Sequence, residues 1–540
     1  MRTTTVKFAA HVMTIVLAFA ASDVRAAPRK LIGHGWDTTA ARTEDIYRDR
    51  AKFAATGLDG ILVPVDGVGA DGKRFRCSNM LSDWQGTRPQ KWTDACFAQT
   101  REQLAAITKC RGLSESLGLV FLIPGKRIAW EDDAFWSLVE GNMRTYARTI
   151  RAGGLKGIAL DQEDYYNARQ FSQTTDDPPG TVARARQRGR QFFGALFSEF
   201  PEAQVLGFWL FSNHENLWRP FLDGMLDVIP PPARIIDGNE DFGYWARADR
   251  GDFRNDRWYV SANLRDAAVA PENRAKYAAA ISSSSGHYLD NYIFKPGEFG
   301  NYYMPPLDGS RLLRLEDNLA SAVRYADDLV WIYGERGTFI DWSRKDDPKH
   351  RRRTWEEQLP GLARTLRLAA GDPAALDAEI AAGILTNLVR NSGCDRQGTE
   401  TTPKPYGTWT RLLKADQSKI FAYEPNDGCA KRGCLRLNGD GYYYVCVGGL
   451  KPGEPLYIRL AVKGEGFFGY NWRTGGKSLH FVDRNAARGD PDTDRGDGWR
   501  TAFVRAVVPE GVDGVQLSVT GFADRENPVF YDDICIFRRK

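Results

Sequence analysis

Short, continuous apolar runs recur along the first two thirds of the chain, and a segment with helical periodicity follows most of them. Continuous rather than alternating apolar residues are typical of parallel strands that are buried on both faces of a sheet. Eight such runs precede residue 345. The runs are KLIGHGWD (30–37), GLDGILVPVDG (57–67), LGLVFLIPGK (117–126), GLKGIALDQED (154–164), AQVLGFWLFSN (203–213), ARIIDGNEDFGYW (233–245), GHYLDNYIF (286–294) and DDLVWIYGERG (328–337).

Eight strand-helix units in about 310 residues predict an α/β fold of the (β/α)8 TIM-barrel type. No GxGxxG or P-loop pattern follows any of the runs, which disfavours an open nucleotide-binding sheet. The sixth and seventh strands are the least defined, because RWYVSANL (257–264) is another possible strand. The helical segment after residue 354 is expected to close the barrel or to pack beneath it.

The pattern changes after the polar segment CDRQGTETTPKPYGTW (394–409), which predicts a linker or domain edge. Beyond it come short alternating strands such as PLYIRLAVKG and VDGVQLSVTGF, separated by turn residues. Alternation of this kind predicts an all-β sandwich. The expected organisation is a signal peptide over 1–26, a catalytic barrel over 27–392 and a β-sandwich over 393–540.

The N-terminal residues indicate the compartment in which the protein is found. Arg2 and Lys7 precede an apolar stretch of about 14 residues, and Val24-Arg25-Ala26 supplies a small-x-small cleavage pattern. The stretch falls short of the roughly 20 residues that span a bilayer, so a signal peptide is favoured over a membrane anchor. We therefore expect a secreted or periplasmic protein without an integral membrane segment.

Charge and cysteine content restrict the partners and cofactors. The 540 residues include 73 Lys and Arg against 69 Asp and Glu, which argues against a nucleic-acid partner. Eight cysteines in an exported chain predict disulfide bonds, with the pairing left open. No CxxC spacing is present, and neither a metal site nor an organic cofactor is predicted. The oligomeric state is left open.

The stretch GIALDQEDYY (157–166) carries the strongest chemical signal. In a barrel of this class the active site lies at the carboxyl ends of the strands, where Asp161 and Glu163 would point to the same side. Repulsion between two close carboxylates raises one pKa and produces a proton donor near neutral pH. Glu163 is the expected general acid and Asp161 the group that tunes it. The alternative is that both are ordinary acids at a helix N-terminus.

Polar and aromatic residues also end other predicted strands. Aromatic rings beside acids suit sugars, because C–H faces stack on Trp and Tyr while hydroxyls bond to carboxylates, Asn and His. The alternative for each residue is a place in the core or in a loop ion pair. The expected substrate-binding residues are His34, Trp36, Asp37, Trp209, Asn213, Asp241, Tyr333 and Glu335.

HGWD, GLDGILVPVDG, GIALDQEDYY and DDLVWIYGERGTFIDW together resemble bacterial (β/α)8 glycoside hydrolases, including chitinase-like enzymes with a DxE fourth strand. The longer DxxDxDxE pattern of chitinases is absent, and so is the Asn-Glu pair of the large retaining clan. The C-terminal DGWRTAFVRAVVPEGVDGVQLSVTGF and VFYDDICIF look like the last strands of jelly-roll carbohydrate-binding modules. These resemblances imply an exported enzyme that hydrolyses a poly- or oligosaccharide.

A glycosidase of this kind needs a second carboxylate opposite the acid. Glu240 ranks first, because IIDGNED repeats the fourth-strand pattern of an apolar run that ends in acids. Asp241, Asp290, Glu298 and Glu335 are the other candidates. A non-catalytic polysaccharide-binding protein and a transglycosylase remain alternatives. A lone acid without a facing carboxylate would favour the binding protein.

Overall fold

A computed structural model describes most of the chain, in two compact units. The first unit is Arg29–Ala370 and the second includes the described residues from Gly371 onward. The expected signal peptide, residues 1–26, lies outside the described residues. The described residues are 30–82, 89–298, 302–394, 406–410, 420–429, 432–439, 441–464, 466–487, 498–521 and 528–540.

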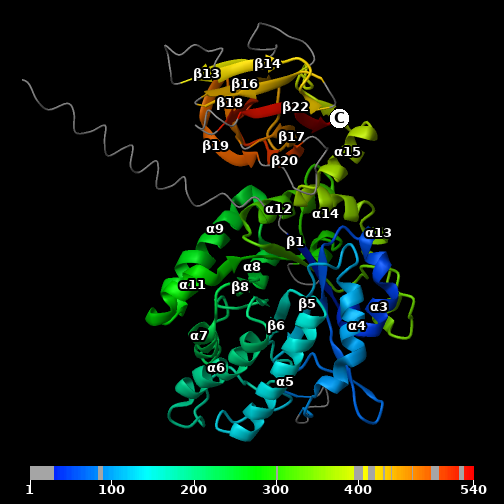
Figure 1. Ribbon diagram of the computed structural model, residues 1–540, viewed down its shortest axis with the longest axis vertical. Helices are drawn as coiled ribbons and strands as arrows, with labels where there is room; N and C mark the ends of the chain where they lie inside the picture. Colours follow the sequence, from blue (N-terminus) through cyan, green and yellow to red (C-terminus); the bar gives the residue numbers. More distant parts are fainter. Residues whose placement is uncertain are drawn as a thin grey trace, which may run out of the picture. The chain divides into compact units, whose positions relative to one another are not determined.

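Nine parallel strands form a curled sheet in the first unit, in the order β10-β11-β1-β2-β5-β6-β7-β8-β9 (Figure 1). Each of the eight predicted runs contains one of these strands, and the expected α/β class is confirmed. The strands are β1 Lys30–Gly35, β2 Gly60–Val63, β5 Leu117–Phe121, β6 Gly157–Asp161, β7 Gln204–Gly207, β8 Arg234–Asp237, β9 Ile281–Ser283, β10 Gly286–Tyr288 and β11 Leu329–Gly334. A small hairpin, β3 Asp66–Val68 and β4 Arg74–Arg76, follows β2.

The two end strands of this path, β9 and β10, are consecutive in the chain. Only Ser284 and Ser285 separate them, while β9 pairs with β8 and β10 pairs with β11. The Ser284 N–H donates to the Asp237 carbonyl at 3.0 Å, and the Trp331 N–H donates to the Ser285 carbonyl at 3.3 Å. One short segment therefore bonds to both neighbouring strands.

The segment RWYVSANL is not a strand. Its residues lie in the helix α9 Asp252–Trp258, the π-helical turn Tyr259–Asn263 and the first residue of α10. Val260 is fully buried, and its carbonyl accepts a 2.6 Å hydrogen bond from the Tyr277 hydroxyl. Tertiary contacts of this kind override the β-propensity of Trp, Tyr and Val.

Helices flank the sheet, and neighbouring helices pack closely (Figure 1). α6 and α7 approach so closely at Gly189 that an added Cβ would lie 1.9 Å from the Phe221 carbonyl oxygen. The N-terminus of α5 is capped by Asp132, whose carboxylate accepts from the Phe135 N–H at 2.8 Å. Besides α9, the helices of the first unit are α2 Trp36–Ala40, α3 Thr43–Asp49, α4 Ala98–Ile107, α5 Asp133–Ala152, α6 Thr181–Glu199, α7 Trp218–Val228, α8 Glu240–Trp245, α10 Leu264–Ala268, α11 Arg274–Ala280, α12 Arg311–Tyr325, α13 Trp355–Gln358 and α14 Leu362–Ala370.

Both faces of the curled sheet are buried, as continuous apolar runs require. Neighbouring residues of one strand alternate between two hydrophobic clusters, so that Ile158 joins the cluster under the helices and Ala159 joins the other. The second cluster draws on almost every strand of the sheet. It includes Ile32, Leu62, Leu119, Ala159, Leu206, Ile236, Tyr288 and Trp331.

The second unit contains two antiparallel sheets, ordered β14-β15-β22-β17-β20 with β12 beside β22, and β13-β16-β21-β18-β19. One hydrophobic cluster takes side chains from both, such as Ile458 and Leu517. The helix α15 Pro373–Ala381 precedes the strands. The strands are β12 Leu385–Asn387, β13 Gly407–Thr410, β14 Phe421–Glu424, β15 Cys434–Leu437, β16 Gly441–Gly448, β17 Pro455–Lys463, β18 Gly466–Thr474, β19 Lys477–Ala487, β20 Trp499–Val507, β21 Gly514–Gly521 and β22 Val529–Arg539.

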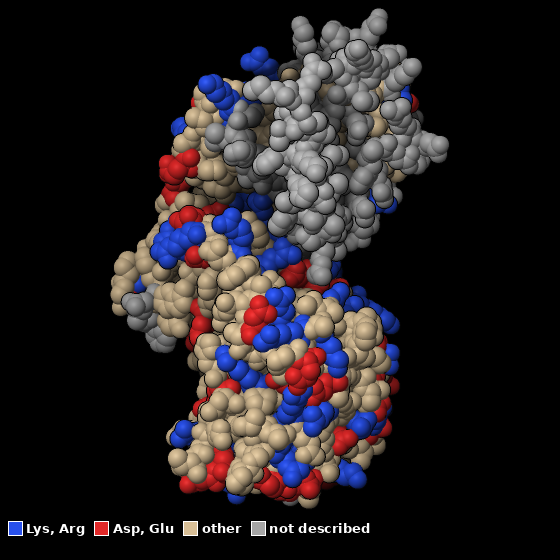
Figure 2. Space-filling view, turned by 90° about the vertical axis from the view of Figure 1, so that its left-hand side faces the viewer, with Lys and Arg blue, Asp and Glu red and all other residues tan. Residues whose placement is uncertain are grey.

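Two further findings bear on the sequence-based expectations. No disulfide bond joins the eight cysteines, so the expected disulfides are absent from the structure; Cys77, for example, is fully buried and packs as a small hydrophobic side chain. Figure 2 shows Lys, Arg, Asp and Glu interspersed over one face of the first unit. No helix within the described residues combines the length and apolar character needed to cross a membrane.

Candidate active site

Asp161 is the last residue of β6 and lies buried at the carboxyl end of the sheet. Its Oδ1 accepts a 2.9 Å hydrogen bond from the Glu163 N–H, which holds the two residues together. Burial raises the pKa of Asp161, and the negative charge of Glu163 raises it further. The pair therefore holds a proton that an isolated Asp or Glu would have lost at neutral pH.

Glu163 follows the strand and is half-buried. Burial raises the pKa of Glu163 to about 7, and the charges of Asp241 and Glu335 act in the same direction. These two acids belong to the ends of β8 and β11, which are distant from β6 in the sequence. The curled sheet thus brings carboxyl groups from three strand ends within electrostatic range of one another.

Glu240 and Asp241 differ in environment although they are neighbours at the start of α8. Burial raises the pKa of Glu240 well above its usual range, the charge of Glu163 adds to this, and the adjacent Tyr244 hydroxyl offsets part of it. Asp241 is exposed. The residue before them, Asn239, has a left-handed backbone (φ 37°) that turns the chain from strand into helix. Burial therefore favours the neutral form of the Glu240 carboxyl.

Aromatic rings stack beside these acids. His34, at the end of β1, lies 5.3 Å from the Tyr333 ring, and Tyr333 stacks on Tyr244 at 6.1 Å. The Tyr333 hydroxyl donates to Glu335 at 3.2 Å. Burial lowers the pKa of His34 to about 3, so its imidazole is neutral. The site therefore presents neutral polar groups and aromatic faces next to carboxyls.

Two aromatic residues of this region were missed by the sequence analysis. Tyr302 stacks on Trp245 at 4.7 Å, and Trp245 is 41% exposed. Burial raises the pKa of Tyr302, and the charges of Asp241 and Glu240 contribute. Tyr302 follows no predicted strand, so only the run of tyrosines in NYYMPP (301–306) could have indicated it.

Several expected site residues lie elsewhere or have structural partners. Asp37 is completely buried, where its Oδ2 accepts from the Phe339 N–H and the Trp342 indole N–H, both at 2.9 Å. We therefore leave Asp37 out of the proposed site. The Trp36 ring lies against Lys349 and Arg352, at 5.3 and 5.1 Å from its centroid.

Three other expected residues bond to neighbouring backbone or side chains. Asn213 Oδ1 accepts from the Glu215 N–H at 2.7 Å. Asp290, a candidate second carboxylate, accepts from the Glu335 N–H at 2.8 Å. Glu298 forms an ion pair with Arg336 at 2.9 Å.

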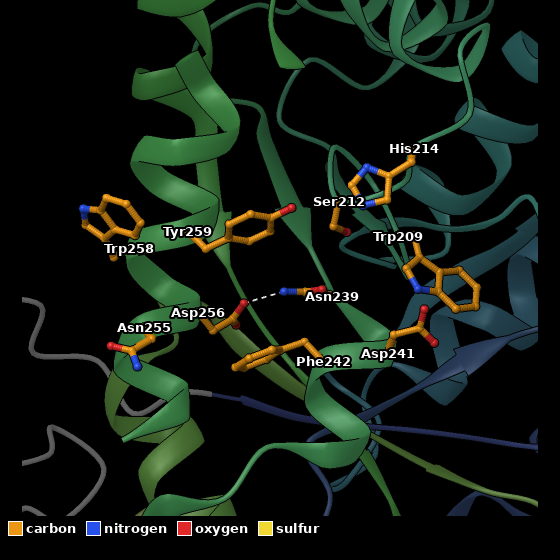
Figure 3. A pocket seen from close by; sticks show the side chains of 10 residues that line it. All are labelled: Trp209, Ser212, His214, Asn239, Asp241, Phe242, Asn255, Asp256, Trp258 and Tyr259. Carbon is orange, nitrogen blue, oxygen red and sulfur yellow. Dashed lines mark hydrogen bonds between the residues drawn. The ribbon is translucent and has the colours of Figure 1, made fainter. Parts of the chain in front are cut away.

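A cavity of about 610 Å³ adjoins the acids on the side of β7 and β8 (Figure 3). Trp209 and Asp241 line one side of it, and Asp256 and Tyr259 line the other. Trp209, an expected substrate-binding residue, thus faces open space next to the acids. The described residues that line it are Trp209, Ser212, His214, Asn239, Asp241, Phe242, Asn255, Asp256, Trp258 and Tyr259. Among the residues that the structure describes, no three His, Cys, Asp or Glu side chains are arranged to hold a metal ion.

Comparisons with known proteins give only partial likenesses. No protein-family model matches the chain, and no curated protein matches it. The CBM22-1 xylan-binding domain of Paenibacillus barcinonensis Xyn10C is 13% identical, with 29% of this chain and 96% of that chain covered and a TM-score of 0.20. A putative sugar-binding protein of Bacteroides thetaiotaomicron is 9% identical over 29% of this chain and 100% of that chain, with a TM-score of 0.21.

The CBM22-1–GH10 modules of the Clostridium thermocellum endo-1,4-β-D-xylanase 10B are 12% identical over 28% of this chain, with a TM-score of 0.21. This match spans 28% of the length of that xylanase chain. Likenesses of this extent establish neither a fold nor a ligand.

Proposed function

We propose that the protein is an exported glycoside hydrolase that cleaves glycosidic bonds of a poly- or oligosaccharide. The observation that carries the proposal is the convergence of Glu163 with Asp241 and Glu335 beside aromatic rings and an open cavity. A half-buried acid with a pKa of about 7 can donate a proton near neutral pH, as a general acid requires. Carboxyl groups close enough to raise the pKa of Glu163 disfavour the alternative of a binding protein with a lone acid.

In the proposed mechanism Glu163 gives its proton to the glycosidic oxygen while the bond from that oxygen to the anomeric carbon breaks. An ionised carboxylate on the opposite side acts as base toward water or as nucleophile, and water finally supplies the hydroxyl group of the new reducing end. Asp161 positions Glu163 by accepting the hydrogen bond from its N–H, while burial and the charges of Asp241 and Glu335 raise the pKa of Glu163.

The electrostatics refine the choice of second carboxylate. The sequence favoured Glu240, but burial raises the pKa of Glu240 well above its usual range and favours its neutral form, and a neutral carboxyl is a poor base or nucleophile. Asp241 is exposed, adjoins the cavity and lies close enough to Glu163 to raise its pKa. We assign the role of base or nucleophile to the exposed Asp241 and a hydrogen-bonding role to the Glu240 carboxyl.

The proposed fold for this site is a closed (β/α)8 barrel, with β9 and β10 as two halves of the seventh strand. The hydrogen bonds of Ser284 and Ser285 to the flanking strands support closure, as does the single inner cluster fed by almost every strand. We further propose residues 1–26 as an export signal, the first unit as the catalytic domain and the second unit as a jelly-roll domain of the carbohydrate-binding type.

The test is sugar release from a panel of bacterial, plant and algal polysaccharides by the chain without residues 1–26. Glu163→Gln is expected to reduce kcat by at least about 100-fold, because general acid catalysis contributes 10²–10⁴. Glu102→Gln, on the exposed surface of α4, is the matched control and should retain full activity.

Paired variants distinguish the two acids of α8. Asp241→Asn is expected to abolish turnover, whereas Glu240→Gln, which preserves a neutral hydrogen-bonding group, should retain much more of it. Equal activity of Glu163→Gln and the unaltered protein on every cleaved substrate would place the acid elsewhere. Polysaccharide binding without any sugar release would favour the non-catalytic alternative.

A further inference from the structure

Four aromatic side chains border the cavity beside Asp241: Trp209, Phe242, Trp258 and Tyr259. Trp258 is 62% exposed, so its ring is accessible to a ligand. The negative faces of such rings attract both the C–H faces of sugars and cations, with Trp the most effective. The walls of the cavity therefore suit a sugar that carries a positive charge.

The charged groups of the lining point to the same kind of ligand. Asp241 and Asp256 supply two carboxyl groups, and none of the ten lining residues named above is Lys or Arg. Arg219 lies outside the lining, and its Nη2 is 3.0 Å from His214 Nδ1. The polar groups of the cavity thus offer acceptors rather than positive charge on the side of β8 and α9.

Asp256 is the more buried of the two acids, at 3% exposure. It accepts a hydrogen bond from the Asn239 side-chain amide (Figure 3). Burial raises the pKa of Asp256 to about 8, and the charge of the nearby Asp237 adds to the effect. A cation beside such a carboxyl restores its ionised form and gains the attraction between the two charges.

The cavity is also preformed. Asp237, at the end of β8, accepts from the Ser212 N–H at 2.9 Å, the Ser212 hydroxyl at 2.7 Å and the Asn239 N–H at 3.2 Å. These bonds fix the loop after β7 against the start of α8. A site that is already ordered loses little conformational entropy when a ligand binds.

The cavity is continuous with the proposed catalytic acids. Asp241 lines it and also raises the pKa of Glu163. On the other side, the Gln162 amide donates to the Trp209 carbonyl at 3.0 Å. A sugar unit in the cavity would therefore adjoin the bond presented to Glu163.

We propose that this cavity is a subsite for a hexosamine unit with a free, protonated amino group, held by Asp256 and stacked on the aromatic walls. The protein is then directed at glycans with unacetylated amino sugars rather than at neutral or uronic acid polymers. The binding of an amino sugar follows from the cavity itself, and its cleavage rests on the proposed function.

Calorimetric titration tests the subsite with ligands that differ only at C2. Chitosan tetramer carries amines, its fully N-acetylated counterpart carries amides, and cellotetraose carries hydroxyls; an α-1,4-galactosamine oligomer and its N-acetylated form cover the other epimer. At least one free-amine oligomer is expected to bind about tenfold or more tightly than its acetylated or hydroxyl partner. Titrations use the catalytically impaired Glu163→Gln chain and the unaltered chain.

Asp256→Asn should remove this preference and leave cellotetraose binding unchanged, since the amide preserves shape but not charge. Asp266→Asn, on the exposed α10, is the matched control and should retain the preference. If Asp256→Asn fails to fold by circular dichroism, Trp258→Ala replaces it, because its exposed ring can be removed without a change in the core. Trp258→Ala should weaken amino-sugar binding at least threefold.

Equal affinity for amine and hydroxyl oligomers, a preference for uronic acid oligomers or no binding of any amino sugar would overturn the subsite. So would an unchanged preference in Asp256→Asn. Failure of the proposed function gives a different result, in which the amine preference is present and no glycan is cleaved. Cleavage restricted to neutral glycans would instead support the enzyme and refute the subsite.

Discussion

The burial of Asp256 predicts how the free energy of unfolding depends on pH. Replacement by Asn retains an amide oxygen for the Asn239 side chain and removes the ionisable carboxyl. Because the folded state raises the pKa of Asp256 from 3.8 to about 8, the folded protein keeps the proton while the unfolded chain releases it. The stability that the proton on Asp256 contributes is therefore fully present below about pH 4 and is lost as the pH rises toward 8.

The expected magnitude follows from the two pKa values. Each pH unit between them contributes about 1.4 kcal/mol, and about four units separate 3.8 from about 8, which gives a loss of about 5 kcal/mol at pH 8. Side-chain relaxation and water entry reduce this figure in real proteins, so about 2–5 kcal/mol is the working range. Asp256→Asn removes the loss, and the variant should be more stable than the unaltered protein at pH 8.

Urea unfolding of both proteins at pH 4 and pH 8 measures the effect, with tryptophan fluorescence as the signal. The variant minus wild-type difference in unfolding free energy should increase by at least about 2 kcal/mol between the two pH values. Asp266→Asn, a fully exposed acid on the neighbouring helix, should show no such increase. A difference that is constant with pH would refute the reasoning about Asp256.

Three other predictions concern packing, a buried hydrogen bond and the pH dependence of catalysis. Gly189→Ala should lower the free energy of unfolding in urea by more than about 2 kcal/mol, because an added Cβ has no room between α6 and α7. Gly194→Ala, on the same helix, is the control. An added Cβ there meets no atom within 4 Å, so this variant should be more stable by about 0.5–1 kcal/mol. Asp37→Ala should destabilise by about 2–5 kcal/mol in the same assay, because it leaves two buried N–H donors without their acceptor. Glu335→Gln should move the alkaline limb of the kcat/KM pH profile to lower pH by about one unit, because loss of a neighbouring negative charge lowers the pKa of Glu163. An unchanged pH profile would contradict the inference that Glu335 raises this pKa.

The strands were predictable because burial on both faces of the sheet requires a continuous run of apolar residues, which is visible in the local sequence. The run GIALD, for example, is β6 in the structure, and the alternation of Ile158 and Ala159 between two clusters explains why it is apolar throughout. The run 233–245 was less predictable, since β8 ends at Asp237 and α8 begins three residues later. Asn239, in a left-handed conformation, makes this change of direction within the run.

The cavity was not predictable from the sequence. Asp256, Trp258 and Tyr259 follow no predicted strand, and their β-favouring neighbours suggested a strand where the structure has α9 and a π-helical turn. Asp37 was expected in the site because it follows a strand. In the structure it is buried and accepts from Phe339 and Trp342, which lie 302 and 305 positions away in the chain.

The sequence by itself determined which segments become strands and that acids follow several of them, because hydrophobic period and strand-end composition are local properties. The tertiary structure decided which acids share one electrostatic environment, which of two adjacent acids is the less exposed, and which aromatic rings line the cavity. These properties depend on distances between residues far apart in the chain. A pKa or a cavity responds to those distances, and local sequence patterns do not encode them.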